Sequence, residues 1–583
     1  MDHALGRASA GALILTAERL GHLETPAPAS LHPPPVRREH RQVLTTLYRW
    51  IDRNILELGR ELRLSYLPPL MVYCAAGVSG LTGIVGTFFV KDYLGLSAAF
   101  LAALGFWAGI PWALKMPIGH LVDLMWRHKA GLVYLGAALI ATSLAIMIGL
   151  IGQPEVMRAV MPVEAWFVLS TLLSPVGYVM QDAVADAMTV EAVPRLDEHG
   201  RPLPDDAVRL MHTTMQMLGR VAIIGGTVLV SIANVVMFAG AASLAEAQKV
   251  AIYLRIYEYA MIIPLLSVSG VMLAGMLKRR EARRLAALGR DRAEIDRLLH
   301  EPQEKTAPNW WILGGSAAFI AITLAVGLSG IDYGEELIFT ASFAVIGFMI
   351  VRLVRELAPD ARRMLLGTII VIFVFRALPG PGAGASWWMI DELGFDQSFL
   401  SRLDLITSGL TLAGLFLFRR FMAEKSIAQI VVFLTVTTTL LSLPIIGMFH
   451  GLHHWTANLT GGMVDARFIA IANTALESPL GQVSMVPMLA WIANSAPPHL
   501  KATYFAVMAS FTNLALSAAQ LGTKYLNEIY VVSRAVKDAA TGAITTPANY
   551  GELGALLVTV TVLGLVLPLA AIALTRLLGL RSA

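Results

Sequence analysis

Two stretches of the chain share one frame: Ser174–Pro194 reads SPVGYVMQDAVADAMTVEAVP, and Ser478–Pro498 reads SPLGQVSMVPMLAWIANSAPP. Each begins Ser-Pro-x-Gly-x-Val, continues as an apolar run and ends at a proline. The copies differ in charge, because Asp182 and Asp186 of the first correspond to apolar residues in the second. We interpret them as equivalent helices of a duplicated chain in which one half carries the acid.

The composition is that of a membrane protein. Of 583 residues, 56% are hydrophobic and only 15% are charged, and the mean hydropathy is +0.64. Soluble domains carry roughly 25% charged residues. Apolar runs of ~20 residues recur, and each is long enough to cross the bilayer as a helix with its backbone groups paired internally. We therefore expect an all-α polytopic membrane protein.

Fourteen segments are candidate spans. In chain order they are residues 68–90, 97–118, 130–152, 161–187, 210–238, 249–277, 309–331, 336–356, 364–390, 397–420, 427–449, 465–494, 502–526 and 552–577.

The charged loops orient these spans. Lysine and arginine gather in the loops on the side of the N-terminus, above all in Lys278 through Arg297, and are sparse in the opposite loops. Basic loops remain in the cytoplasm, so we expect both termini to be cytoplasmic and the protein to lie in the inner or plasma membrane. The formal net charge of +4 is small and spread out, which excludes a nucleic-acid-binding face.

A second repeat defines the architecture. Phe88–Ser97 (FFVKDYLGLS) resembles Trp387–Asp396 (WWMIDELGFD), with Asp92 and Asp391 299 residues apart, close to the separation of the first repeat. The sequence thus predicts two parallel six-helix repeats with an inserted helix pair, the arrangement of major facilitator transporters, whose substrate site lies between the halves. The predicted parts are a disordered cytoplasmic tail (1–40), an amphipathic cytoplasmic segment (41–66), a first six-helix half (67–277), a basic cytoplasmic linker (278–308), the inserted pair (309–356) and a second six-helix half (364–577).

The loop after the second span resembles the major facilitator motif Gly-x-Leu-x-Asp followed by basic residues. Gly119, Asp123 and Arg127 occupy its positions. We expect a conformational latch, in which Asp123 meets a helix N-terminus or an arginine in one state and releases it in the other. The alternative is an ordinary basic loop.

The fourth span carries Gln181, Asp182 and Asp186. The two aspartates are four residues apart and share one helix face. Carboxylates inside a span are costly and face a cavity or a partner. We expect this pair to load and release a proton during transport; the alternative is a static charge pair with Arg220 or Lys115.

Three basic residues stand in apolar helices. Arg220 either neutralises the aspartates or binds a substrate carboxylate through two N–H donors of its guanidinium group. Lys115 either binds substrate or extends its amine to the membrane interface. Arg376 stands near an expected helix break and is a second candidate for an anionic substrate, or is structural.

The polar candidates of the second half are uncharged. Asn513 and Gln520 are seven residues apart and share a face, where amides either bind ring nitrogens and carbonyls or bond neighbouring helices. Gly225 and Gly226 indicate close helix packing. We find no enzyme signature and predict no cofactor and no metal site.

Several segments together resemble the folate–biopterin transporter family of the major facilitator superfamily. They are FFVKDYLGLSAAF, IPWALKMPIGHLVD, QDAVADAMTVEA and VSMVPMLAWIANSAPPHLKATYFAVMASFTNLALSAAQLG. The resemblance covers roughly residues 68–277 and 364–530, although LVDLMWRHKAG departs from the usual loop of the family.

The resemblance implies a carrier of folates, pterins or related metabolites, with Asp182, Asp186 and Arg220 at its functional core. We accordingly expect a monomeric, proton-coupled symporter of an organic anion that works by alternating access. Two alternatives remain: a carrier of another solute similar to muropeptide permeases, which share Gln181-Asp182 and the PW-LK stretch, or a non-transporting assembly or pigment-delivery factor.

Overall fold

The computed structural model describes residues 57–580, except 95, 114, 195, 198, 200, 301–307, 309, 330, 356, 358, 489–500 and 538–543. The chain divides into two units, Met1–Arg60 and Glu61–Ala583. Helix α2 (Glu57–Arg60) belongs to the first unit. The predicted tail and most of the predicted amphipathic segment lie outside the described residues.

The first half of the larger unit consists of helices joined by short turns. Its elements are η2 (Leu64–Tyr66), α3 (Leu67–Val78), η3 (Ser79–Thr82), α4 (Gly83–Tyr93), α5 (Ala98–Ala113), α6 (Lys115–Leu124), η4 (Trp126–His128), α7 (Ala130–Gly152), α8 (Pro154–Val160), α9 (Val163–Ala192), α10 (Asp205–Met237), η5 (Ala241–Ser243), α11 (Glu246–Ala260), α12 (Ile262–Ala287) and α13 (Arg292–His300).

The inserted pair and the second half follow. Their elements are α14 (Trp310–Ser329), α15 (Gly334–Arg355), α16 (Pro359–Arg376), α17 (Ala383–Asp391), α18 (Gln397–Leu417), α19 (Arg419–Glu424), α20 (Ile427–Phe449), α21 (Leu452–Leu459), α22 (Ala466–Glu477), η6 (Ser478–Leu480), α24 (Lys501–Ile529), β1 (Val536–Lys537), β2 (Ile544–Thr546) and α25 (Leu553–Leu577). Strands β1 and β2 pair antiparallel.

Ten helices among the described residues are long and apolar enough to cross a membrane. They correspond to ten of the fourteen predicted spans. The other four predicted spans contain α14, the pair α16 and α17, the pair α22 and η6, and α24. The predicted architecture of membrane-spanning helices is thus confirmed, with β1 and β2 as a short addition, while the count of fourteen stays a prediction.

The first helix of each half is interrupted at the same place in the repeat. Ser79–Thr82 forms a 3₁₀ turn between α3 and α4, and residues 377–382 separate α16 from α17. Helix α16 ends at Arg376 because Pro379 and Pro381, which follow in ALPGPG, cannot donate backbone hydrogen bonds. Helix α24 pairs with this break, because Gly380 N donates to Thr523 Oγ1 at 2.9 Å. Backbone that leaves the helical pattern inside the bundle is thus satisfied by a neighbouring helix.

The fourth helices of the two halves differ, although both contain Ser-Pro. Helix α9 runs through Pro175 without a break, whereas its counterpart leaves the α-helical form at Ser478. The Ser478 carbonyl accepts the turn's own bond from Gly481 N at 3.1 Å and a second bond from Thr411 Oγ1 of α18 at 3.0 Å. The acidic helix is therefore the unbroken one of the pair.

Small residues allow close approach of helices in the first half. A Cβ on Gly136 of α7 would lie 2.6 Å from the Gly177 carbonyl oxygen of α9, and the reverse distance is the same. A Cβ on Gly226 of α10 would lie 2.9 Å from Gly77 Cα of α3. Such small-residue contacts are the usual way in which helices associate without a hydrophobic driving force in lipid.

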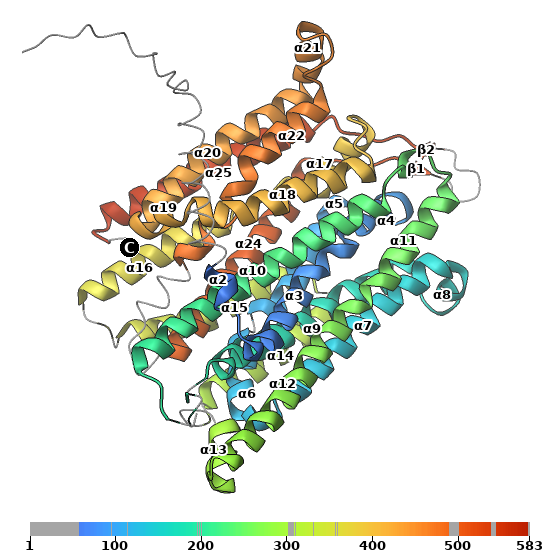
Figure 1. Ribbon diagram of the computed structural model, residues 1–583. Helices are drawn as coiled ribbons and strands as arrows, with labels where there is room; N and C mark the ends of the chain where they lie inside the picture. Colours follow the sequence, from blue (N-terminus) through green and yellow to red (C-terminus); the bar gives the residue numbers. More distant parts are fainter. Residues whose placement is uncertain are drawn as a thin grey trace, which may run out of the picture. The chain divides into compact units, whose positions relative to one another are not determined.

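The two halves meet along two helix pairs, α5 with α24 and α10 with α18. In Figure 1 the outer helices of the first half (α7, α11, α12) and of the second half (α20, α22, α25) lie on opposite sides of these pairs. The α10–α18 contact includes a hydrogen bond between the hydroxyls of Ser231 and Ser408 at 3.1 Å. A bundle of this kind places the space between the halves at its centre.

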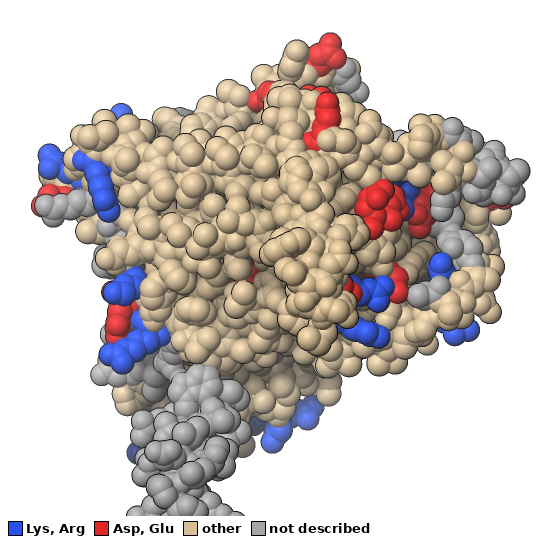
Figure 2. All heavy atoms as spheres, turned by 90° about the horizontal axis from the view of Figure 1, so that it is seen from above, with Lys and Arg blue, Asp and Glu red and all other residues tan. Residues whose placement is uncertain are grey.

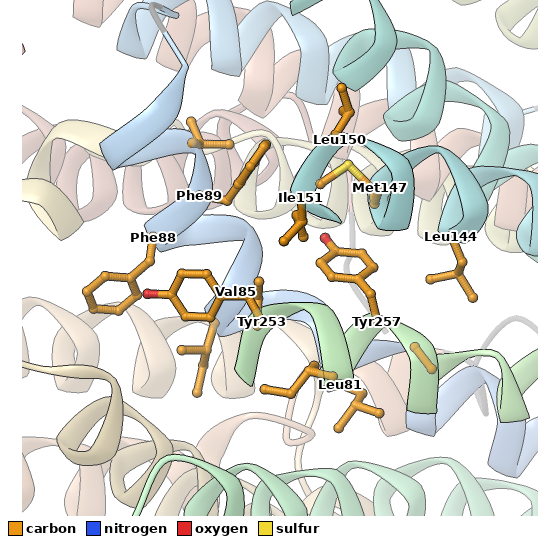
Figure 3. Packing of buried hydrophobic residues seen from close by; sticks show 14 of the residues in the cluster. Leu81, Val85, Phe88, Phe89, Leu144, Met147, Leu150, Ile151, Tyr253 and Tyr257 are labelled. Atoms are coloured by element: carbon orange, nitrogen blue, oxygen red, sulfur yellow. The ribbon is translucent and has the colours of Figure 1, made fainter. Parts of the chain in front are cut away.

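We name the two ends of the bundle by residues at each, the Lys91 end and the Lys129 end. An apolar cluster closes the first half at the Lys91 end, where Tyr253 and Tyr257 of α11 pack against Leu81 and Val85 (Figure 3). Much of the face shown in Figure 2 is uncharged, and its Lys, Arg, Asp and Glu gather mainly toward the left and right sides of the view. This distribution suits a surface that contacts lipid.

The close contact of α10 with α3 generates a stability prediction. Gly226→Ala should lower the free energy of unfolding by ~1–3 kcal/mol, because the new methyl would meet backbone atoms. The adjacent Gly225→Ala should be neutral or slightly stabilising, because its Cβ would meet no atom within 4 Å. Thermal unfolding of the two purified variants measures the difference, and equal melting temperatures would contradict the contact.

Candidate functional site

One amine is shared by the two aspartates of the acidic helix. Lys115 Nζ lies 2.5 Å from Asp182 Oδ2 and 2.8 Å from Asp186 Oδ2. Tyr73 of α3 donates its hydroxyl proton to Asp186 Oδ1 at 2.6 Å. Three helices, α3, α6 and α9, thus bring one cation, two carboxylates and one phenol together within the membrane-spanning part of the chain.

The two carboxylates differ in exposure. The side chain of Asp182 is 17% exposed and that of Lys115 is 22% exposed, whereas the side chain of Asp186 is 44% exposed. Because one lysine cannot neutralise two ionised carboxylates, the group carries a formal excess of one negative charge. Asp186 is the carboxylate that solvent or a solute reaches more easily.

Gln181 has a structural position. It is 2% exposed, accepts a bond from Ser267 Oγ of α12 at 2.9 Å and donates to the Val133 carbonyl of α7 at 3.4 Å. Together with the Gly136–Gly177 contact, these bonds set the position of α9. Asp182 and Asp186 then face α6 and α3 rather than α7.

Arg220 lies on α10 beside this group but is not its ion-pair partner. Its neighbour Gly219 packs against the Tyr73 ring, since a Cβ there would lie 3.0 Å from Tyr73 Cε2. Within the described part of the chain, the acids pair with Lys115 and no ion pair of Arg220 is found. Of the two static pairs considered from the sequence, the structure contains the one with Lys115.

Arg376 ends α16 where the first helix of the second half breaks. Its Nε donates to the Thr512 carbonyl at 3.2 Å, and its Nη1 lies 3.4 Å from Met485 Sδ. Among the described residues it has no carboxylate partner. The guanidinium borders a small pocket with Ile372, Phe375 and Ser484, and it keeps donors that these contacts do not use.

Asn513 and Gln520 both face helix α5, as their shared helix face predicts. Asn513 Nδ2 donates to the Trp112 carbonyl at 3.1 Å, and Gln520 packs against Gly105. Between them Ser517 packs against Gly109. These residues line the α5–α24 seam between the halves.

The loop at the Lys129 end contains a compact charge cluster. Lys129 forms an ion pair with Glu191, whose carboxylate also lies 2.9 Å from Lys278 Nζ. Lys129 Nζ lies 3.6 Å from the centroid of the Trp126 ring. Burial lowers the pKa of Lys129 to about 8, although Glu191 opposes that shift. This cluster joins the start of α7 and the end of α9 to the middle of α12.

The residues of the predicted latch lie beside this cluster. Arg127 forms an ion pair with Asp296 of α13, the helix that follows the long extension of α12. Asp123 is partly buried on the last turn of α6, and Gly119 has open space where a Cβ would lie.

Sequence reasoning missed a cluster that joins the halves at the Lys91 end. Lys91 Nζ lies 2.6 Å from Asp391 Oδ1, and Tyr550 donates to Asp391 Oδ2 at 2.5 Å. Arg534 donates to the Lys91 carbonyl. Burial, with the neighbouring Asp391, raises the pKa of Tyr550, so its phenol stays a donor. The signal was present, because the second repeat places a charged residue at this point in both halves.

Two further polar groups were not recognised as site residues from the sequence. Tyr73 was not considered, because a tyrosine in an apolar run gives no signal of its partner. Asp404 stands inside α18, and its side chain is exposed. The described residues hold no group of three or more His, Cys, Asp or Glu side chains arranged for a metal ion.

The fold is similar to that of two solved transporters. A POT family transporter in complex with 5-aminolevulinic acid superposes with a TM-score of 0.55 at 12% identity, covering 88% of this chain and 96% of that one. A variant of the nucleoside transporter NupG gives a TM-score of 0.51 at 12% identity, covering 88% and 99%. The predicted major facilitator fold is thereby confirmed.

Sequence comparison then gives the family. The model of the BT1 family matches residues 76–579, so the chain belongs to the BT1 family. The folate-biopterin transporter of Synechocystis sp. is 23% identical over 475 residues, covering 81% of this chain and 76% of that protein. Folate transporter 2 of Plasmodium falciparum is 26% identical over 159 residues, covering 26% and 31%. The chain is a multi-pass membrane transporter and not an enzyme, and the predicted family resemblance is confirmed.

The shared amine generates a second prediction. Lys115→Met should lower the free energy of unfolding by ~3 kcal/mol, because it leaves two carboxylates in the membrane without their ion-pair partner. Adding Asp182→Asn should restore part of the loss, since one of the two charges is removed. A double-mutant cycle on melting temperatures measures the coupling. Additive losses would show that Lys115 and Asp182 do not interact.

Proposed function

We propose that this transporter carries a folate, a pterin or a related organic anion by alternating access, coupled to protons as a symporter. The observation that carries the proposal is the sharing of Lys115 between Asp182 and the more exposed Asp186. The names of the relatives, a folate-biopterin transporter and a folate transporter, support the substrate class.

Asp186 is the proton carrier in this proposal. When it is ionised, both its oxygens accept bonds, one from Tyr73 and one from Lys115. When it is protonated, one oxygen becomes a donor, and a phenol can accept that bond whereas an ammonium cannot. Tyr73 therefore accommodates both forms of Asp186, while Asp182 keeps Lys115 paired throughout.

The proposed site offers the substrate both a negatively charged acceptor and positively charged donors. An aminopyrimidinone ring donates hydrogen bonds that a carboxylate accepts, which suits Asp186. The glutamate tail of a folate requires donors, which Arg376 and Arg220 supply without competition from a carboxylate in direct contact among the described residues. Gln181, Asn513 and Gln520 contribute by holding the helices around this space rather than by direct contact.

The two ends of the bundle open alternately in this proposal. The Lys129 end faces the cytoplasm of the cell, as the basic loops predict, and both termini lie on that side of an inner or plasma membrane. Gly119, Asp123 and Arg127 form the latch of that end, with Asp296 as the present partner of Arg127. One chain holds all the proposed groups, which supports a monomer as the working unit.

Uptake by proteoliposomes tests the proposal. Radiolabelled folate and biopterin are supplied to the purified protein with the outside acidified, and accumulation should exceed that without a gradient and vanish with an uncoupler. Uptake of neither probe would overturn the substrate class. Uptake that ignores the gradient would overturn the coupling.

The same assay tests Arg376. Arg376→Gln should weaken apparent folate affinity by ~10–100-fold, because a hydrogen bond between charged groups is lost. Biopterin lacks the glutamate tail and serves as the control, so its uptake should be unchanged. An equal loss for both probes would make Arg376 a structural residue.

A further inference from the structure

The inserted helices α14 and α15 pack on the seam between the two halves. Buried Phe106 and Ile110 of α5, Phe319 of α14, Ile338 of α15 and Leu521 of α24 form one apolar cluster. A Cβ on Gly327 of α14 would lie 2.9 Å from the Trp107 ring, so the glycine allows the indole to lie against that helix. The inserted pair thus contacts both halves at once.

Two glutamates at the start of α15 supply the polar part of this contact. Glu335 Oε1 accepts from Trp107 Nε1 of α5 at 3.1 Å, and Glu335 Oε2 lies 3.3 Å from Lys524 Nζ of α24. One carboxylate therefore bonds the first half with one oxygen and the second half with the other. All three side chains are at least partly buried, which strengthens such bonds relative to bonds in water.

The neighbouring glutamate differs in one respect. Glu336 Oε1 lies 3.5 Å from Lys524 Nζ and accepts a bond from the Tyr525 hydroxyl. Both partners belong to α24, so these bonds of Glu336 reach the second half alone. Two adjacent carboxylates at similar depth thus provide a bridging residue and a matched non-bridging one.

We propose that the inserted pair is a strap, in which Glu335 ties Trp107 of the first half to Lys524 of the second and favours the conformation closed at the Lys91 end. A pair that only filled space beside the bundle would have no need of a charged group bonded to both halves. Charged groups inside a membrane protein are costly unless they are paired, and Glu335 can keep both of its bonds only while α5 and α24 keep their present spacing. When the halves separate along this seam, at least one of the two bonds must break.

The strap acts on the same end as the Lys91–Asp391 contact but is independent of it. Helix α15 begins at the Lys91 end, because α14 starts after the linker at the opposite end. The strap and the Lys91–Asp391 contact share no residue. Loss of the strap should therefore shift the equilibrium between conformations without abolishing closure.

Distances between spin labels test the proposal without any transported solute. Cysteines replace the exposed Val160 of the first half and Met463 of the second half, both at the Lys91 end, in a background with Cys74→Ser. Pulsed dipolar spectroscopy on the full chain should find mainly the short distance. Glu335→Gln should raise the ratio of long to short distances about tenfold, the effect of losing one bond to a charged group.

Two further variants complete the test: one removes the donor that bonds Glu335, and the other is a matched control. Trp107→Phe keeps a ring against Gly327 but removes the indole donor, and it should reproduce the effect of Glu335→Gln. Glu336→Gln should change the ratio by less than twofold, because its bonds lie within the second half. Distances unchanged in both Glu335→Gln and Trp107→Phe would overturn the strap, as would an effect of Glu336→Gln equal to that of Glu335→Gln.

Discussion

The amine of Lys115 is the interaction on which the acidic centre of the molecule depends. Two carboxylates four residues apart on a membrane helix would repel each other and lose their hydration, a combination that is costly in lipid. Lys115 bonds both within 2.8 Å and so makes the pair tolerable. One lysine leaves one of the two negative charges unneutralised. We assign that charge to Asp186, the more exposed acid.

The remaining structure of the first half holds this centre in position. Gln181, one residue before Asp182, is anchored by Ser267 and the Val133 carbonyl, and Gly136 and Gly177 bring α7 and α9 into backbone contact. In the second half the equivalent helix carries no acid at these positions and breaks at Ser478 against α18. One half thus provides the carboxylates on an unbroken helix, whereas the other offers Arg376 at a break in its first helix.

Much of the fold could be predicted from the sequence, because apolar runs and repeated motifs report directly on helices and duplication. The spacing of Asp182 and Asp186 also indicated one face of one helix. The spacing left Lys115 and Arg220 both as candidate partners of these acids, because the choice between them depends on the rotation of α6 and α10. For the same reason the roles of Tyr73 and Glu335 emerge only from the packed helices, whereas the second repeat marked Asp391 without giving Lys91 as its partner.

The central claim is that Asp186 carries the coupled proton while Lys115 stays with Asp182. Reconstituted Asp186→Asn protein distinguishes binding and movement of the substrate from coupling, because exchange of labelled for unlabelled folate needs no net proton transfer. The account predicts that this variant still exchanges folate, at a weaker apparent affinity because asparagine keeps one acceptor oxygen for the ring, but no longer accumulates folate under an imposed pH gradient. Accumulation at the wild-type level in Asp186→Asn would contradict it.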